Sequence, residues 1–261
     1  MAIISVPFHQ DEQLREGTIP LSSEATLITP ELPGTSLWDR LATLYSAVAS
    51  AVSTEIEASA TATVVSGDCM VALGVVAGVQ RAGTDPSIIW FDAHGDVHTM
   101  ASSTSGYIGG MALRMVLGGD YSLVGERIGL RPLAESRAVL VDARDLDPAE
   151  ADYLAAAEIT RCPVDDVRIP DGPLVLHVDI DVIDAGDVPG LLFPVSNGPS
   201  TSSVLDAIRR IIATGNVVAL DLAFTWHSAP EHHDLHADLV RTLVGWGASQ
   251  ANSASSGNSE T

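Results

Sequence analysis

The chain has 261 residues, 46% of them hydrophobic, which suits one large domain with a sizeable core. Its formal net charge of −21 argues against nucleic acid and anionic membrane surfaces as partners, because both attract basic faces. All 13 basic residues are arginine, which excludes Schiff-base lysine chemistry and the P-loop lysine.

The cysteine content and the length of the apolar runs indicate where in the cell the protein is expected. Two cysteines, Cys69 and Cys162, are too few for a disulfide framework, which favours a reduced, cytoplasmic protein. The N-terminus has no basic region followed by an apolar run, so no signal peptide is predicted. No apolar run reaches roughly 18 residues, so no transmembrane helix is expected.

Short β-rich apolar runs alternate with longer amphipathic stretches along the chain. Strands are predicted, in chain order, at residues 2–7, 61–66, 87–91, 138–142, 174–178 and 217–222. Helices are predicted at residues 37–58, 70–80, 109–117, 148–157, 203–213 and 236–246. This alternation predicts a mostly parallel sheet within a single three-layer α/β/α domain over residues 1–246. The Ser-, Gly- and Asn-rich residues 247–261 are expected to form a disordered tail.

Two of the predicted strands lead into acidic clusters. One is followed by Asp92, His94 and Asp96, and a later one by Asp179 and Asp181. Residues i, i+2 and i+4 of an extended segment point the same way, so the side chains of each cluster should converge. Ligands of open α/β sheets bind beyond the carboxyl ends of the strands, so both clusters should meet in one crevice.

Four aspartates at close quarters repel one another, and without cations some must stay protonated or turn to solvent. Carboxylates with one imidazole suit Mn²⁺, with Zn²⁺ and Fe²⁺ as alternatives. Two neighbouring ions would lower the pKa of a bound water enough to give hydroxide near neutral pH. The alternative, that these aspartates are turn residues and helix caps, is disfavoured because two such clusters each follow a buried strand.

Both clusters resemble motifs of the arginase, agmatinase and formimidoylglutamase (ureohydrolase) family. Residues 91–99, FDAHGDVHT, resemble the DAHxDxNT motif, and residues 177–184, HVDIDVID, resemble the DxDxxDP motif. Residues 66–70, SGDCM, stand where the family has GGDHS. The resemblance extends over about residues 64–224 in the family's order. It implies an arginase-like fold with an eight-stranded sheet, a dinuclear manganese site and hydrolysis of a guanidino or related C–N bond.

The resemblance also implies a role for each matching acidic residue. Asp92 and Asp179 would bridge two metal ions. Asp96 would bind the first ion, whereas His94 and Asp181 would bind the second.

Further positions match residues that hold the substrate in that family. Ser105 would contact the amino-acid end of the substrate, and Asp147 and Glu150 would hold its α-amino group. Tyr107 replaces an Asn that helps to bind the substrate carboxylate. Helix capping by Asp147, with Glu150 in the first turn, is the alternative explanation for that pair.

Cys69 replaces the first metal-binding histidine of the family. A thiolate ligand is softer than imidazole and favours Zn²⁺ or Fe²⁺ over Mn²⁺. It also leaves a cluster of four carboxylates and two dications formally at −1, which weakens the Lewis acid. In the alternatives, Cys69 stays a thiol and only one ion remains, or it is a packed residue, or it is a nucleophile for which no base is visible.

Two other departures from the family motifs affect substrate binding and proton transfer. Phe224 stands where arginases carry the glutamate that pairs with guanidinium, and Glu231 is a candidate replacement. Gly109 stands where arginases have a proton-shuttling histidine. His98, nearby in sequence, is predicted to act as an acid or base or as a hydrogen-bonded supporting residue, and Asp181 is the other candidate for relaying the proton.

These observations predict a metal-dependent hydrolase acting on a guanidino, formimino or related linear amidine substrate, with metal-bound hydroxide as the nucleophile. A substrate less basic than arginine, such as N-hydroxy-arginine or formiminoglutamate, is expected because Phe224 and Gly109 replace the residues with which arginases handle the guanidinium group. Two alternatives stay open: a metal-binding protein with little catalysis and a regulatory or assembly role, and a deacetylase-type amide hydrolase. The expected partner is a small molecule, and the resemblance implies a homo-oligomer, either a trimer or a hexamer.

Overall fold

The computed structural model describes residues 3–21 and 24–256, and its centre is one eight-stranded sheet. The strands lie in the order β4-β1-β5-β10-β9-β6-β7-β8, and all of the strand pairs described for this sheet are parallel. In chain order they are β1 (Ile3–Val6), β4 (Thr26–Leu27), β5 (Ala62–Ser66), β6 (Ser87–Asp92), β7 (Ala138–Asp142), β8 (Thr160–Cys162), β9 (Leu174–Asp179) and β10 (Val217–Ala223). A separate antiparallel pair consists of β2 (Phe8–His9) and β3 (Glu12–Gln13).

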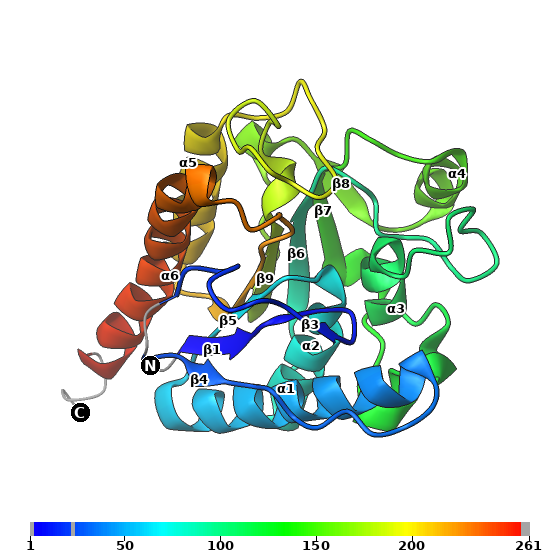
Figure 1. Cartoon of the computed structure of the whole chain (residues 1–261), viewed down its shortest axis with the longest axis horizontal. Helices are drawn as coiled ribbons and strands as arrows, with labels where there is room; N and C mark the ends of the chain where they lie inside the picture. The colour runs from blue at the N-terminus through cyan, green and yellow to red at the C-terminus, as the bar shows by residue number, and fades with distance from the viewer. Residues whose placement is uncertain (1–2, 22–23, 257–261) are drawn as a thin grey trace.

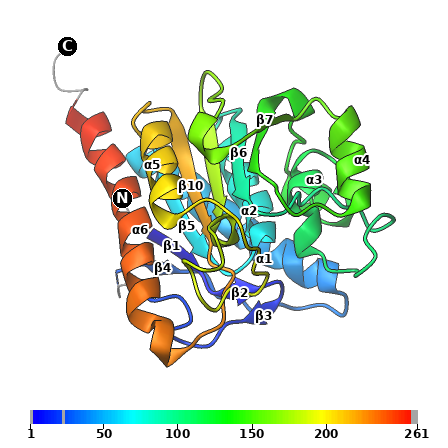
Figure 2. The same cartoon turned by 90° about the horizontal axis from the view of Figure 1, so that it is seen from above.

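Helices cover both faces of the sheet, as Figures 1 and 2 show. One hydrophobic cluster joins one face of the sheet to the first four helices, which are α1 (Leu37–Ser59), α2 (Ala72–Arg81), α3 (Ala112–Val116) and α4 (Pro148–Ala156). A second cluster joins the other face to α5 (Thr201–Ile212) and α6 (His233–Ser256). The predicted three-layer arrangement is therefore confirmed.

The central strands form because their apolar residues are buried on both faces of the sheet. All residues of β5, β6 and β9 are buried. In β6, Ile88 and Trp90 pack towards α1 and α2, whereas Ile89 and Phe91 pack towards α5 and α6. This alternation decides which way the polar residues at the strand ends point.

The predicted strands and helices are all present, with their ends shifted by a few residues. Two predicted helices begin with 3-10 turns, η1 (Cys69–Val71) before α2 and η2 (Gly109–Met111) before α3. The last helix continues to Ser256, beyond the predicted end at residue 246, and so includes the first part of the predicted tail. Residues 257–261 of that tail lie outside the described residues. Among the described helices, none combines the length and the apolar character needed to span a bilayer.

Candidate metal centre and cleft

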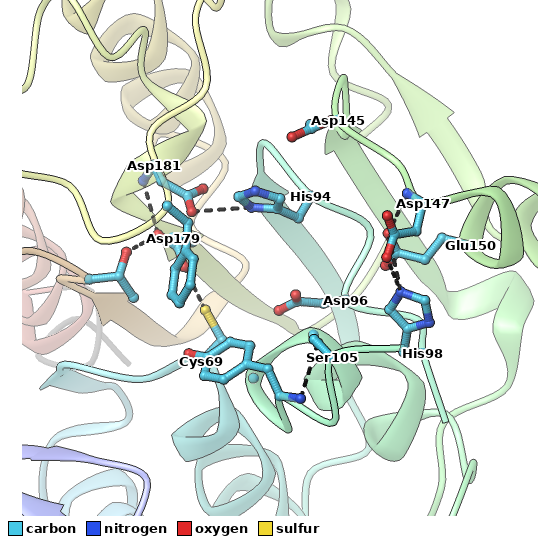
Figure 3. A pocket seen from close by; sticks show the side chains of 15 residues that line it. Cys69, His94, Asp96, His98, Ser105, Asp145, Asp147, Glu150, Asp179 and Asp181 are labelled. Atoms are coloured by element: carbon cyan, nitrogen blue, oxygen red, sulfur yellow. Dashed lines mark hydrogen bonds and ion pairs between the residues drawn. The ribbon is translucent and has the colours of Figure 1, made fainter. Parts of the chain in front are cut away.

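The predicted site residues gather at the carboxyl edge of the sheet, beyond the neighbouring strands β5, β10, β9 and β6. Figure 3 shows that their side chains converge from these separate strand ends. Parallel strands bring their carboxyl ends to one edge, so segments far apart in sequence supply one site.

Asp92 ends β6, and the backbone then turns so that His94 folds back onto it. The backbone N–H of His94 donates to Asp92 Oδ1 at 2.7 Å, and the ring Nδ1 lies 3.2 Å from the same oxygen. Nδ1 also lies 3.2 Å from Asp181 Oδ2 in the segment after β9. One imidazole therefore connects the two predicted clusters. Asp96 follows with φ of +53°, a left-handed conformation that is uncommon for residues other than glycine.

Asp179 ends β9 and caps the 3-10 turn η7 (Ile180–Val182). Its Oδ1 accepts hydrogen bonds from the backbone N–H of Asp181 at 2.9 Å and from the hydroxyl of Thr225 at 2.7 Å. Asp181 Oδ1 accepts from the backbone N–H of Ala93 at 3.3 Å, which joins the end of β9 to the end of β6. Both carboxyl groups are thus fixed in place, and both are buried.

Cys69 lies at the start of η1, just after β5, and is buried. Its Sγ lies 2.7 Å from Asp179 Oδ2, where the thiol donates to the carboxylate. Burial, followed by the charges of Asp179, Asp96 and Asp92, raises the pKa of the Cys69 thiol well above its ordinary value. Without a cation nearby, Cys69 is therefore a thiol. The structure brings it to the predicted cluster as a neighbour of Asp179.

The buried cluster contains more acidic groups than its one basic group, His94, can neutralise, and this determines which of them are protonated. Burial and then like charges raise the pKa of Asp96 and Asp179 well above the usual range, and they raise that of Asp181 to about 6. Burial opposes the charge of His94, but its hydrogen bonds to Asp181 and Asp92 raise its pKa to about 12. Burial would also raise the pKa of Asp92, yet the hydrogen bonds and charge of His94 bring it below its usual value.

The arrangement fits one or two divalent cations. Ligand atoms of Cys69, Asp92 and Asp179 lie within 4.8 Å of one another, and so do those of Asp92, His94 and Asp181. Asp92 belongs to both groups, as a bridging carboxylate would. Asp96 Oδ2 is buried and has no hydrogen-bond partner among the described residues. A buried carboxylate oxygen without a partner is costly, and a cation removes that cost.

The cluster forms part of the wall of a cavity of about 350 Å³. The cavity is lined by Cys69, His94, Asp96, His98, Ser105, Tyr107, Gly109, Gly110, Asp145, Asp147, Glu150, Asp179, Asp181, Phe193 and Thr225. This list contains all of the predicted metal and substrate residues except Asp92, which lies behind them with 1% of its surface exposed. None of the described lining residues is arginine, so the cavity favours neutral or cationic molecules.

His98, Asp147 and Glu150 form a hydrogen-bonded group on the cavity wall (Figure 3). His98 Nδ1 lies 3.1 Å from Ser102 Oγ, and its Nε2 lies 3.1 Å from Asp147 Oδ2. Glu150 Oε2 accepts from the backbone N–H of Asp147 at 3.1 Å, and Oε1 accepts from that of Val97 at 3.2 Å. Helix capping at the start of α4 and exposure to the cavity therefore occur together.

Ser105 and Tyr107 come from the loop between β6 and η2. The backbone N–H of Tyr107 donates to Ser105 Oγ at 3.2 Å. The Tyr107 ring lies 4.9 Å from that of Phe193, centroid to centroid, and its hydroxyl lies 3.4 Å from His9 Nε2. Burial, and then the charge of Asp68, raises the pKa of Tyr107 far above its usual value. Its hydroxyl therefore keeps its hydrogen.

The position expected to carry a guanidinium partner turns into the core. Phe224 is 1% exposed and packs against Trp226, with ring centroids 4.7 Å apart. The next residue, Thr225, lines the cavity instead. Glu231 is exposed in the 3-10 turn Pro230–His232 and does not line the cavity, so the prediction that it replaces the missing glutamate is wrong.

Four residues of the cavity wall were not predicted: Gly110, Asp145, Phe193 and Thr225. Asp145 follows β7 as the other acids follow their strands, so the same signal could have identified it. Phe193 reaches the cavity from the long loop between η7 and α5, and no local pattern indicates this. Thr225 became recognisable only through its hydrogen bond to Asp179.

A buried network supports Asp92 from behind. Trp90 Nε1 donates to Asp92 Oδ2 at 3.0 Å, and its ring stacks on that of His177 at 3.6 Å. His177 Nδ1 lies 2.7 Å from Asp221 Oδ2, and Trp90, His177 and Asp221 are all 0% exposed. The orientation of Asp92 is therefore fixed by three strands, β6, β9 and β10.

Comparisons with known proteins give a consistent picture. A sequence model of the arginase family matches residues 32–225. An arginase from Eremothecium gossypii is 33% identical over 198 residues, which are 67% of this chain and 49% of that protein. An N(omega)-hydroxy-L-arginine amidinohydrolase from Streptomyces lavendulae is 31% identical over 184 residues, 68% of this chain and 65% of that enzyme. The match thus spans only about half to two thirds of these relatives.

The solved structures agree in fold over nearly the whole chain. An arginase from Bacillus cereus superimposes with a TM-score of 0.78 at 23% identity, covering 94% of this chain and 96% of that one. A formimidoylglutamase from Bacillus subtilis superimposes with a TM-score of 0.67 at 15% identity, covering 95% and 86%.

Proposed function

The chain belongs to the arginase family, and from this premise we propose that it is a metal-dependent hydrolase that cleaves a C–N bond in a small guanidino compound or a related linear amidine. The observation that carries the proposal is the buried acidic cluster around Asp92, which opens into a cavity without basic residues among those described. Such a cavity attracts the cationic or polar C–N groups on which the family's relatives are named to act.

We assign the metal ligands as the sequence predicted them. Asp92 and Asp179 would bridge two ions, typically manganese in this family. Cys69 and Asp96 would complete one site, and His94 and Asp181 the other. Support comes from the two groups of ligand atoms that share Asp92 and from the unpartnered oxygen of Asp96. When bound, such ions supply a Lewis acid that activates water and polarises the substrate.

The side chains of this protein hold the substrate and move protons. Asp181 lines the cavity, and we expect its carboxylate to accept the proton of the attacking water. His98 orients Asp147 through its Nε2, so a proton that leaves His98 towards the cavity passes through that carboxylate. Asp147, Glu150 and Ser105 would hold the end of the substrate that does not react.

The substrate class follows from the charge that the site lacks. Because Phe224 is buried in the core, it offers no carboxylate to a guanidinium, and an unpaired cation in a closed site is costly. We therefore propose a substrate less basic than arginine, such as an N-hydroxyguanidine or a formimino compound. The Streptomyces relative, named as an N(omega)-hydroxy-L-arginine amidinohydrolase, supports this class.

The test combines metal analysis with turnover. Protein reconstituted with Mn²⁺ or Zn²⁺ should hold two ions, and the Cys69→Ala variant one, whereas Cys69→His should restore two. An unchanged count in Cys69→Ala would refute the thiolate ligand. Urea or ammonia should be released from a panel of guanidino, N-hydroxyguanidino and formimino compounds.

The rival functions give other results in the same assay. Release of acetate from acetylated amines would favour a deacetylase. Bound metal without turnover on the whole panel would favour a binding or assembly role. The expected trimer or hexamer, which we propose by family resemblance, can be measured by light scattering on the same samples.

A further inference from the structure

The ring of Tyr107 fills the space into which a side chain at position 109 would project. A Cβ on Gly109 would lie 2.4 Å from Cε1 of Tyr107 and 2.5 Å from its hydroxyl oxygen. Real Cβ atoms do not approach other atoms so closely, so glycine at 109 and the observed ring position require each other. Both residues line the cavity. Tyr107 thus presents a phenol where Gly109 presents no functional group.

His9, which is not among the lining residues of the cavity, contacts the phenol. His9 Nε2 lies 3.4 Å from the Tyr107 hydroxyl, and the two rings are 15° from parallel with centroids 5.9 Å apart. The other ring nitrogen, Nδ1, lies 2.9 Å from the carbonyl oxygen of Gly67. A carbonyl only accepts, so Nδ1 carries a hydrogen. His9 is half-buried and so retains contact with solvent.

A doubly protonated His9 therefore has a partner for each hydrogen. Nδ1–H donates to Gly67, and Nε2–H points at the oxygen of Tyr107, which frees the phenolic hydrogen for the cavity. The distance of 3.4 Å is long for a hydrogen bond, but bonds used in catalysis often shorten only when the charged or reacting state forms.

Two other side chains of the cavity wall that could donate a proton already have hydrogen-bond partners. Both ring nitrogens of His98 have partners, Ser102 and Asp147, and the hydroxyl of Thr225 donates to Asp179. We propose that Tyr107, held by His9, gives the departing amine its proton. This inference rests on the proposed function, since it concerns the leaving group of the same C–N cleavage.

The step balances without any further reactant. As the C–N bond breaks, its electron pair passes to the nitrogen, which takes the phenolic proton of Tyr107. The phenolic oxygen takes the Nε2 proton of His9 at the same time, so Tyr107 ends neutral. His9 changes from imidazolium to neutral imidazole and regains a proton from water after the product leaves.

The test replaces the hydroxyl and keeps the ring. Tyr107→Phe should lower kcat by about 10²- to 10⁴-fold on an N-alkylguanidine, the range usual for a general acid. KM and metal content should stay unchanged, because the proton moves only in the transition state. On an N-arylguanidine, whose leaving amine is weakly basic, the loss should be much smaller. His9→Ala should show the same pattern, with activity partly restored by added imidazole.

Two further variants separate proton transfer from packing. Tyr121→Phe removes a hydroxyl that donates to Leu130 O at 2.7 Å, outside the cavity lining, and should leave kcat unchanged. Tyr107→Asn combined with Gly109→His frees the ring's space for a new imidazole and should recover activity that Tyr107→Asn alone loses.

The outcomes distinguish this inference from the proposed function. If the parent protein turns over no substrate of the panel, the proposed function fails and the inference fails with it. If the parent is active and the kcat of Tyr107→Phe stays within threefold of the parent value, only the inference fails. An equal loss on alkyl and aryl substrates would also overturn it. The ¹⁵N shifts of His9 give a check without turnover: neutral His9 should carry its hydrogen on Nδ1, and a hydrogen on Nε2 would contradict the relay.

Discussion

Phe224 lies at the sequence position of a substrate-binding glutamate, but its side chain points into the core instead of the cavity. Its backbone N–H donates to Ser66 O at 2.7 Å, so the ends of β10 and β5 stay joined there. This pairing turns the Phe224 ring into the core on the α5 and α6 side and turns Thr225 towards Asp179. A motif alignment places a residue along the chain, but the strand pairing decides which face its side chain joins.

Restoring a glutamate at this position should therefore fail. Phe224→Glu would bury an unpaired carboxylate and remove a packed ring, at a cost of about 3–5 kcal/mol or more. The melting temperature should fall by roughly 10 °C, at about 2–4 °C per kcal/mol. Calorimetry should show no gain in arginine binding. The matched control, Phe224→Leu, should cost only about 1–1.5 kcal/mol. A folded Phe224→Glu protein that binds arginine more tightly than the parent would contradict this account.

Arg144, in the segment after β7, joins three loops beneath the site. Its guanidinium donates to the carbonyl oxygens of Val182 and Val195, both at 2.9 Å, and also to that of Asp181 at 3.3 Å. It also pairs with Asp142 at the end of β7. The turn η7, which carries Asp181, is thereby tied to the end of β7, two strands away from β9, and to the loop that bears Phe193.

Removing the Arg144 guanidinium should increase the local opening of η7 and of the loop after it more than that of the hydrophobic core. In Arg144→Met, hydrogen exchange should increase over residues 180–198, because three carbonyl oxygens lose their charged donor. Metal affinity should fall by about 10-fold or more, as it does when groups that orient metal ligands are removed. Arg209→Met, which breaks an exposed ion pair with Asp206, is the control and should change neither quantity. Unchanged exchange over residues 180–198 in Arg144→Met would contradict the assignment.

The elements that could be predicted from sequence are those with a continuous or periodic apolar pattern. β6 and β9 are buried at every position and are mostly apolar before their terminal aspartates, so both strands were identified. The edge strands β4 and β8 were not, because they have two and three residues, most of them exposed. Their pairing depends on a neighbouring strand rather than on their own residues.

The same reasoning explains which part of the site was predicted. Asp92, His94, Asp179 and Asp181 follow buried strands at i, i+2 spacing, so local sequence was sufficient to group them. His9 reaches Tyr107 across 98 positions of sequence, and Phe193 arrives on a loop without a pattern. Such contacts arise from tertiary packing, which a local pattern does not encode.

At the scale of the whole molecule, the site and the surface carry charge of the same sign. The formal net charge is −21, and the acidic cluster lies buried within that field. A large net charge of one sign destabilises the compact state through repulsion, and buried like charges add to it. Divalent cations bound at the cluster would relieve the repulsion among its buried carboxylates. Stability should therefore depend on pH in opposite ways with and without metal.

In the metal-free protein, stability should fall as pH rises from 5 to 7.5. Burial and neighbouring acids raise the pKa of Asp181 from 3.8 to about 6, so the folded state binds more protons than the unfolded state over this range. The stabilisation is complete below the unfolded pKa and is lost as pH passes the folded one. Asp181 alone should lower the free energy of unfolding by about 1–2 kcal/mol over this pH range. The raised pKa of His94, about 12, acts in the same direction, whereas the lowered pKa of Asp92 has its effect below this range.

Saturating Mn²⁺ should reverse this slope, because the ion binds deprotonated carboxylates and its affinity grows as protons leave. Calorimetric unfolding in chelator and in Mn²⁺, at matched ionic strength, measures both slopes. Asp181→Asn should make the metal-free slope less steep, because the contribution of Asp181 is gone while those of the other buried groups remain. Equal slopes with and without Mn²⁺ would mean that the ion does not compete with protons at these carboxylates, and the acidic cluster would then have to be stabilised by something other than a cation.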